Sequence, residues 1–68
     1  MDREIFDKQL RRFLKKVGIN SQEGIDGAVE RAREAGELNG TEALRAEVTV
    51  RLPDLGEEVT IEDRIRLQ

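Results

Sequence analysis

Five carboxylates gather between residues 54 and 63 and are the side chains with the most obvious capacity for chemistry. They are Asp54, Glu57, Glu58, Glu62 and Asp63. Carboxylate oxygens are the ligands that hard cations prefer, and a close carboxylate pair can act as general acid and base. Their spacing does not match a calcium-binding loop, and alternate residues of a strand point to opposite faces. We therefore interpret them as turn residues and a solvated strand, with no metal site.

The chain lacks the two side chains that most often carry catalysis near neutral pH, histidine and cysteine. Their absence excludes disulfides, thiolate nucleophiles and zinc–sulfur sites, and leaves no general base whose unperturbed pKa lies near neutrality. The only aromatic residues are Phe6 and Phe13, on one predicted helix face, so no stacking platform for bases exists. We expect no catalytic residues, no cofactor and no enzymatic activity.

Four basic side chains form the most prominent candidate binding surface. This basic cluster consists of Arg11, Arg12, Lys15 and Lys16. Residues 2–16 hold six positive and three negative charges, whereas residues 17–68 hold six positive and twelve negative. Such a patch can steer a nucleic acid, an acidic ligand or an anionic surface toward it. The commoner explanation is a solvated helix face whose cations complement the helix dipole, so ligand binding is the alternative function.

The length of 68 residues leaves room for one small domain, residues 1–68. A domain of this size buries only about 60% of its unfolded surface and is marginally stable as a monomer, so we expect a homodimer. The N-terminal residues lack the apolar run of a signal peptide, and no apolar run approaches the ~18 residues of a membrane span. We expect a cytoplasmic protein that does not contact membranes.

The first half of the chain predicts two helices. Apolar residues at spacings of three and four indicate a first helix over residues 3–17, with Asp2 as its N-cap. Gly18 is predicted to end it, because glycine adopts the left-handed conformation of a C′ residue without steric cost. Its apolar face contains Phe6, Leu10, Phe13, Leu14 and Val17.

The second helix is predicted over Ser21–Ala35. Asn20 or Ser21 would cap its first turn, and Gly36 would end it at C′. The Asn-Gly dipeptide at residues 39–40 then predicts a turn. The apolar face of this helix contains Ile25, Ala28, Val29 and Ala32.

From Leu44 the hydrophobic period changes to two, which predicts a β-hairpin. Its strands cover residues 44–52 and 59–67, and Pro53–Gly56 forms a four-residue turn. This loop length places Arg51 opposite Glu58, an attractive cross-strand pair. The same register pairs Leu52 with Glu57, Val50 with Val59, Val48 with Ile61, and Leu44 with Ile65.

Asp63 is the one residue that breaks the strand pattern. It falls on the apolar face, opposite Ala46. The carboxylate there predicts a β-bulge, an exposed end of the sheet, or a specific partner for the charge. Asp63 is therefore the single candidate for a site-like residue, although a structural irregularity is the commoner cause of such a break.

The predicted fold class is α+β, with two antiparallel helices packed on one face of a two-stranded antiparallel hairpin (ααββ). Both strand edges stay open, and their pairing in a homodimer would give a four-stranded sheet. The same order of elements occurs in winged helix-turn-helix proteins. If this chain acted in that way, its residues 21–35 would enter the major groove of DNA and its residues 53–57 would form the tip of the wing. Both segments are acidic, and phosphate contacts dominate DNA affinity, so we do not expect nucleic acid as a partner.

The caps and the hairpin together resemble a family of short bacterial proteins known only as a domain of unknown function, DUF6494. The similar segments are Phe13–Ile19 with Ser21 and Gln22, then Ala35–Leu38, then the alternating strands. The resemblance implies a single domain and carries over no activity, cofactor, partner or site residue. From the residues we expect a non-catalytic protein-interaction module that self-associates through the strand edges of its hairpin.

Overall fold

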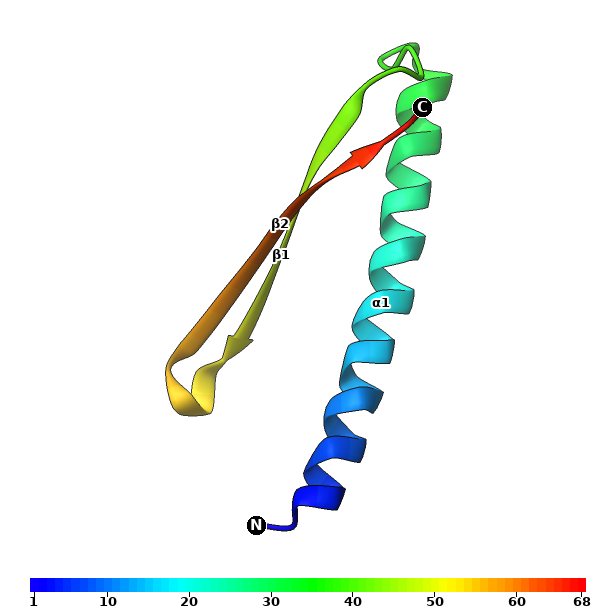
Figure 1. The fold of residues 1–68 in the computed structure, drawn as a ribbon. Coiled ribbons are helices and arrows are strands. Elements are labelled where there is room, and N and C mark those ends of the chain that lie inside the picture. The colour runs from blue at the N-terminus through cyan, green and yellow to red at the C-terminus, as the bar shows by residue number, and fades with distance from the viewer. The chain divides into compact units, whose positions relative to one another are not determined.

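A computed structural model describes all 68 residues and divides them into two compact units, Met1–Ala35 and Gly36–Gln68. The first unit is one helix, α1 (Arg3–Glu34). The second is a hairpin of β1 (Ala43–Leu52) and β2 (Glu57–Arg66), joined by a short 3₁₀ turn, η1 (Pro53–Leu55). Figure 1 shows α1 as one continuous coil and the hairpin as a pair of long strands.

Both ends of α1 lie where the sequence places a helix start and a helix stop. Asp2 is the N-cap, and its carboxylate accepts hydrogen bonds from the backbone N–H of Glu4 at 2.9 Å and of Ile5 at 3.1 Å. These bonds satisfy two of the donors that a first helical turn leaves free. Gly36 follows the C-cap Ala35 with a φ of 72°, the left-handed conformation of a C′ residue. Both predictions are confirmed.

The prediction of two helices is wrong, because the chain continues as a single helix through Gly18. Gly18 lies inside α1 and does not have a positive φ, so it is not a C′ residue. Asn20 and Ser21 are also helical, and neither caps a second helix. The fold is therefore one helix followed by a two-stranded antiparallel hairpin, not two helices on a hairpin.

The apolar pattern explains why the helix does not stop. A glycine inside a helix costs about 1 kcal/mol relative to alanine, which is less than the cost of abandoning several backbone hydrogen bonds. The apolar face also continues past Gly18 on the same side of the helix. Phe6, Val17 and Ala28 follow one another at intervals of eleven residues. That spacing corresponds to about 3.67 residues per turn, so the face runs almost parallel to the helix axis.

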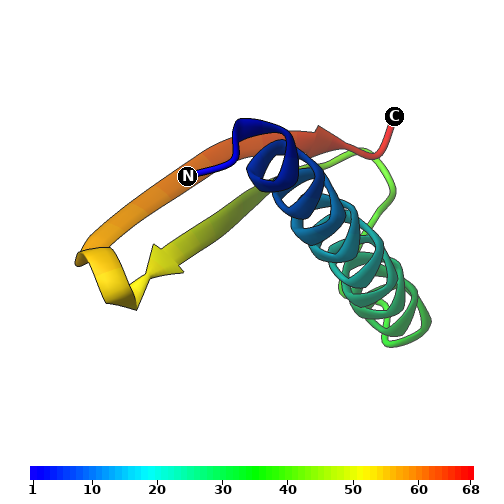
Figure 2. The same ribbon diagram turned by 90° about the horizontal axis from the view of Figure 1, so that it is seen from below.

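The hairpin has the register that its sequence predicts. Leu52 lies opposite Glu57, Val50 opposite Val59, Val48 opposite Ile61, and Leu44 opposite Ile65. The four residues between the strands end with Gly56, whose φ is 64°. The pairing of β1 with β2 runs without interruption from Ala43–Arg66 to Leu52–Glu57. The twist that paired strands adopt is visible in Figures 1 and 2.

No side chain in the structure is buried. Each unit has an apolar face with substantial exposure. Phe13 and Leu14 of α1 are 48% and 50% exposed, and Val59 and Ile61 of β2 are 55% and 60% exposed. Large apolar side chains of a small domain gain stability only when another surface covers them.

Candidate functional site

The basic cluster lies on α1, and all four of its side chains are exposed. At 100° per residue, these four positions spread over about 140° of the helix circumference, on the side opposite Leu10 and Val17. Arg11 donates a hydrogen bond from Nε to the backbone oxygen of Asp7 at 3.3 Å. The cluster is therefore a broad, convex, positively charged surface rather than a pocket.

The five carboxylates do not converge on a common point. No group of three or more acidic side chains has an arrangement that could hold a metal ion. Two of them form ion pairs with arginines on β1 instead. Glu58 lies 3.0 Å from Arg51, and Glu62 lies 3.9 Å from Arg45. Arg45 also contacts Glu47, so it lies between two glutamates that face each other across the strands. These carboxylates form cross-strand ion pairs on the polar face of the hairpin.

Asp63 lies opposite Ala46 in an unbroken ladder, so the β-bulge, one of the three alternatives for this residue, does not occur. The side chain is exposed, and its Oδ1 accepts a hydrogen bond from the backbone N–H of Arg64 at 2.7 Å. A small residue opposite it leaves the carboxylate free to reach water. Asp63 thus places a solvated charge on the apolar face of the hairpin, without forming a site with the other acidic residues.

The most densely hydrogen-bonded side chain is one that the sequence did not single out. The Glu42 carboxylate accepts backbone N–H bonds from Asn39 at 2.9 and 3.1 Å, from Gly40 at 2.9 Å and from Thr41 at 3.0 Å. These bonds, with that of Asn39 the largest contribution, hold the pKa of Glu42 below its usual value, because they stabilise the charged form. Successive backbone N–H groups of this kind form a concave anion-binding nest.

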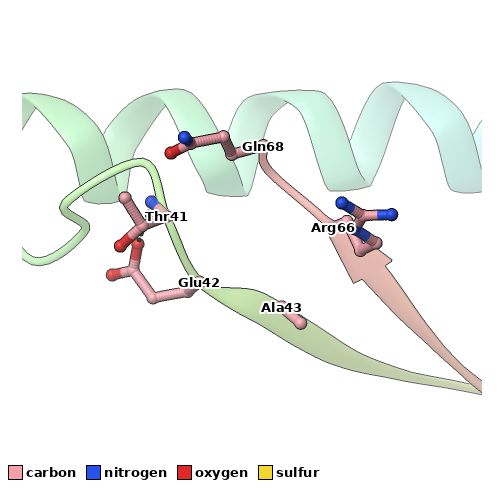
Figure 3. Close-up of a pocket in the computed structure, with 5 residues that line it drawn as sticks. All are labelled: Thr41, Glu42, Ala43, Arg66 and Gln68. Carbon is pink, nitrogen blue, oxygen red and sulfur yellow. Dashed lines mark hydrogen bonds between the residues drawn. The ribbon is translucent and has the colours of Figure 1, made fainter.

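Glu42 occupies that nest itself, so the loop closes on its own carboxylate. The side chain also borders an open hollow at the end of the hairpin, shown in Figure 3. The Asn-Gly dipeptide indicates the turn, but no role for Glu42 was predicted from the sequence. The hollow is lined by Thr41, Glu42, Ala43, Arg66 and Gln68.

A second feature of α1 is apolar rather than charged. Along α1 runs a line of apolar and small residues, which we call the α1 stripe. Its large members are partly exposed, with Phe6 and Leu10 each 41% exposed and Ile25 39% exposed. The stripe comprises Phe6, Leu10, Phe13, Leu14, Val17, Ser21, Gly24, Ile25, Ala28 and Ala32.

The hairpin has a corresponding apolar face. Its residues share one side of the strands because successive side chains alternate. It comprises Leu44, Ala46, Val48, Val50, Leu52, Val59, Ile61 and Ile65. The α1 stripe and this hairpin face both expose large apolar side chains to solvent.

The length of α1 does not make it a membrane span, since the helix is too polar to cross a bilayer. No curated protein and no solved structure matches the chain. One family model matches residues 1–68, and it describes a family of unknown function. The match covers the helix and the hairpin together and confirms the resemblance seen in the caps and strands. The chain therefore belongs to DUF6494, a family of unknown function.

Proposed function

We propose that this chain is a non-catalytic protein-interaction module that associates with itself. The observation that carries the proposal is the exposure of large apolar side chains on both units while no side chain is buried. Fully covering one such side chain contributes about 1.5–3 kcal/mol, so association has a strong driving force. Contiguous apolar patches on small domains usually mark interaction sites. The lack of histidine and cysteine supports the non-catalytic part of the proposal.

The hairpin offers the edges for one such contact. Each strand is paired on one side only, so its outer edge presents free backbone N–H and C=O groups. Both strands have ten residues, longer than the five or six that are typical. A two-stranded hairpin alone is marginally stable in water, and a third and fourth strand from a second chain would stabilise it. Edge pairing between two hairpins would give a four-stranded sheet.

Backbone amide hydrogen exchange at increasing protein concentration tests this contact. We expect amides along Ala43–Leu52 or Glu57–Arg66 to exchange more slowly as concentration rises, because pairing between chains occupies the outer N–H groups. The central amides that already bond across the hairpin serve as internal controls. Exchange rates that do not change with concentration at any strand position would contradict edge pairing.

A second candidate function is the binding of acidic ligands by the basic cluster. Arg12, Lys15 and Lys16 form no ion pair within the chain, so their charges are available to a partner. The winged-helix version of this hypothesis no longer applies, because residues 21–35 are the second half of α1 and not a separate reading helix. Ligand binding would therefore be electrostatic and not specific for sequence.

Heparin, a generic polyanion, is a direct probe of this second function. Binding should weaken as salt concentration rises, and changing all four cluster residues to glutamine should abolish it. Binding that is absent at low salt, or that the quadruple variant retains, would exclude the cluster as a ligand site. Cell fractionation would separately test the cytoplasmic location, which stays a prediction.

A further inference from the structure

We infer that the α1 stripe pairs with the α1 stripe of a second copy of this chain, with the two helices antiparallel. The inference rests on the proposed self-association and names the surface and orientation that a dimer would use. Two features of α1 support it independently. One is the distribution of side-chain size along the stripe, and the other is the distribution of charge along the helix.

The α1 stripe changes from large to small side chains near its middle. Before residue 18 its members are large, whereas after residue 20 all but Ile25 are small. We consider the antiparallel register in which the numbers of two facing residues, one from each helix, add up to 38. In this register Phe6 faces Ala32 and Leu10 faces Ala28. The same register places Leu14 against Gly24, Phe13 against Ile25, and Val17 against Ser21. Each large residue but Phe13 then meets a small one, which is the complementarity that close packing requires.

A parallel pair of the same helices would pack poorly. It would place Phe6 beside Phe6 and Phe13 beside Phe13, and it would leave Gly24 facing Gly24 and Ala28 facing Ala28. The first half would be overfilled and the second half would contain gaps, and both errors destabilise an interface. Side-chain size therefore favours the antiparallel arrangement.

The charges along α1 favour the same orientation. Residues 2–16 hold six basic and three acidic side chains, whereas residues 17–35 hold two basic and four acidic ones. An antiparallel pair brings the basic half of one helix beside the acidic half of the other, and a parallel pair opposes like charges.

The contact is long enough to hold two small chains together. From Phe6 to Ala32 a helix extends about 40 Å at 1.5 Å per residue. The stripe keeps its direction over this length because its eleven-residue spacing nearly matches the period of a straight helix. The flanks contain charged residues, so the pair would have an apolar centre and a polar rim, as stable interfaces do.

Disulfide trapping tests the orientation, because the natural chain has no cysteine. Leu10→Cys and Ala28→Cys variants are prepared separately, mixed in equal amounts under reducing conditions and oxidised, and their disulfides are identified by mass. We expect mixed disulfides to outnumber the two like-with-like disulfides together several-fold, whereas random pairing would give equal amounts of the two kinds. The matched control mixes Arg12→Cys with Asp26→Cys, which lie at the same level of the pair but on the far side, and should pair at random.

The outcomes separate this inference from the proposed function. Random pairing, or an excess of Leu10→Cys paired with itself, overturns the antiparallel contact even if the natural chain is a dimer by light scattering. A natural chain that stays monomeric overturns self-association as well. If the first variants fold poorly by circular dichroism, Val17→Cys with Ser21→Cys tests the same register with less loss of apolar volume.

Discussion

The Glu42 carboxylate lies 2.9 Å from the backbone nitrogen of Gly40 and closes the loop between helix and hairpin on itself. Gly40 has a φ of 90°, a conformation that side-chain-bearing residues rarely adopt, so the N–H groups around it can point inward together. The N–H groups of Asn39 and Thr41 complete the set of donors. The loop thereby satisfies backbone donors that no strand or helix uses.

Glu42→Gln should destabilise the protein at neutral pH and have little effect in acid. The folded-state pKa of Glu42 is lowered by the backbone N–H bonds, first that of Asn39. A lowered pKa contributes stability above the unfolded-state pKa, and this contribution is lost as pH falls through the folded-state pKa. Urea unfolding at several pH values measures the difference, with Glu57→Gln as the control on the same hairpin. An equal loss of stability at all pH values would contradict the role of the charge.

Gly18→Ala should stabilise the protein by about 1 kcal/mol, because Gly18 is inside a helix and an added Cβ would meet no other atom. The matched control is Gly36→Ala, which should destabilise by about 1–2 kcal/mol because Gly36 is left-handed. Thermal unfolding by circular dichroism at one protein concentration compares the two variants. A helix that ended at Gly18 would give the reverse result for the first substitution.

Arg51 and Glu58 should show a small favourable coupling in a double-mutant cycle. The Arg51 Nε lies 3.0 Å from the Glu58 Oε1, and both side chains are largely exposed. Exposed cross-strand ion pairs contribute roughly 0.2–1 kcal/mol and weaken as salt screens the charges. Alanine substitutions analysed by urea unfolding at low and high salt measure this coupling. The pair of Arg51 with Glu62, which do not contact each other, should show none.

Asp63→Val should make the chain associate more strongly than the natural chain does. The charge lies on the apolar face of the hairpin, and inward-pointing charges of this kind oppose unwanted pairing of sheet edges. Removing it makes the β2 side of this face apolar without interruption from Val59 to Ile65. Light scattering of the variant at rising concentration should show larger species than the natural chain forms. Asp54→Val, in the turn, is the control, and equal behaviour of the two variants would refute a special role for Asp63.

The hairpin could be predicted from sequence, because the residues that determine its register lie in the two strands and the turn between them. Period-two alternation and a four-residue turn together permit only one register in which apolar residues face apolar residues, and the structure has it. The cap at Asp2 and the stop at Gly36 were predicted for the same reason, since each depends on neighbouring residues alone.

The continuity of α1 could not be predicted by the same means. Gly18 and Gly36 both follow apolar helical residues, yet only Gly36 is left-handed. The difference is in what comes next, because the apolar phase continues beyond Gly18 and ends at Gly36. A local stop signal at Gly18 therefore does not end a helix whose apolar pattern continues on both sides of it. Glu42 was missed because its partners are backbone groups, which have no signature in the side-chain sequence.

The most direct test of self-association is the mass of the natural chain in solution, measured by size-exclusion chromatography with light scattering over a wide concentration range. One chain has a mass of 7.8 kDa. We predict a mass of at least two chains at high concentration, decreasing toward one chain on dilution, because association would remove exposed apolar side chains from water. A constant mass of 7.8 kDa at every concentration would contradict the proposed function.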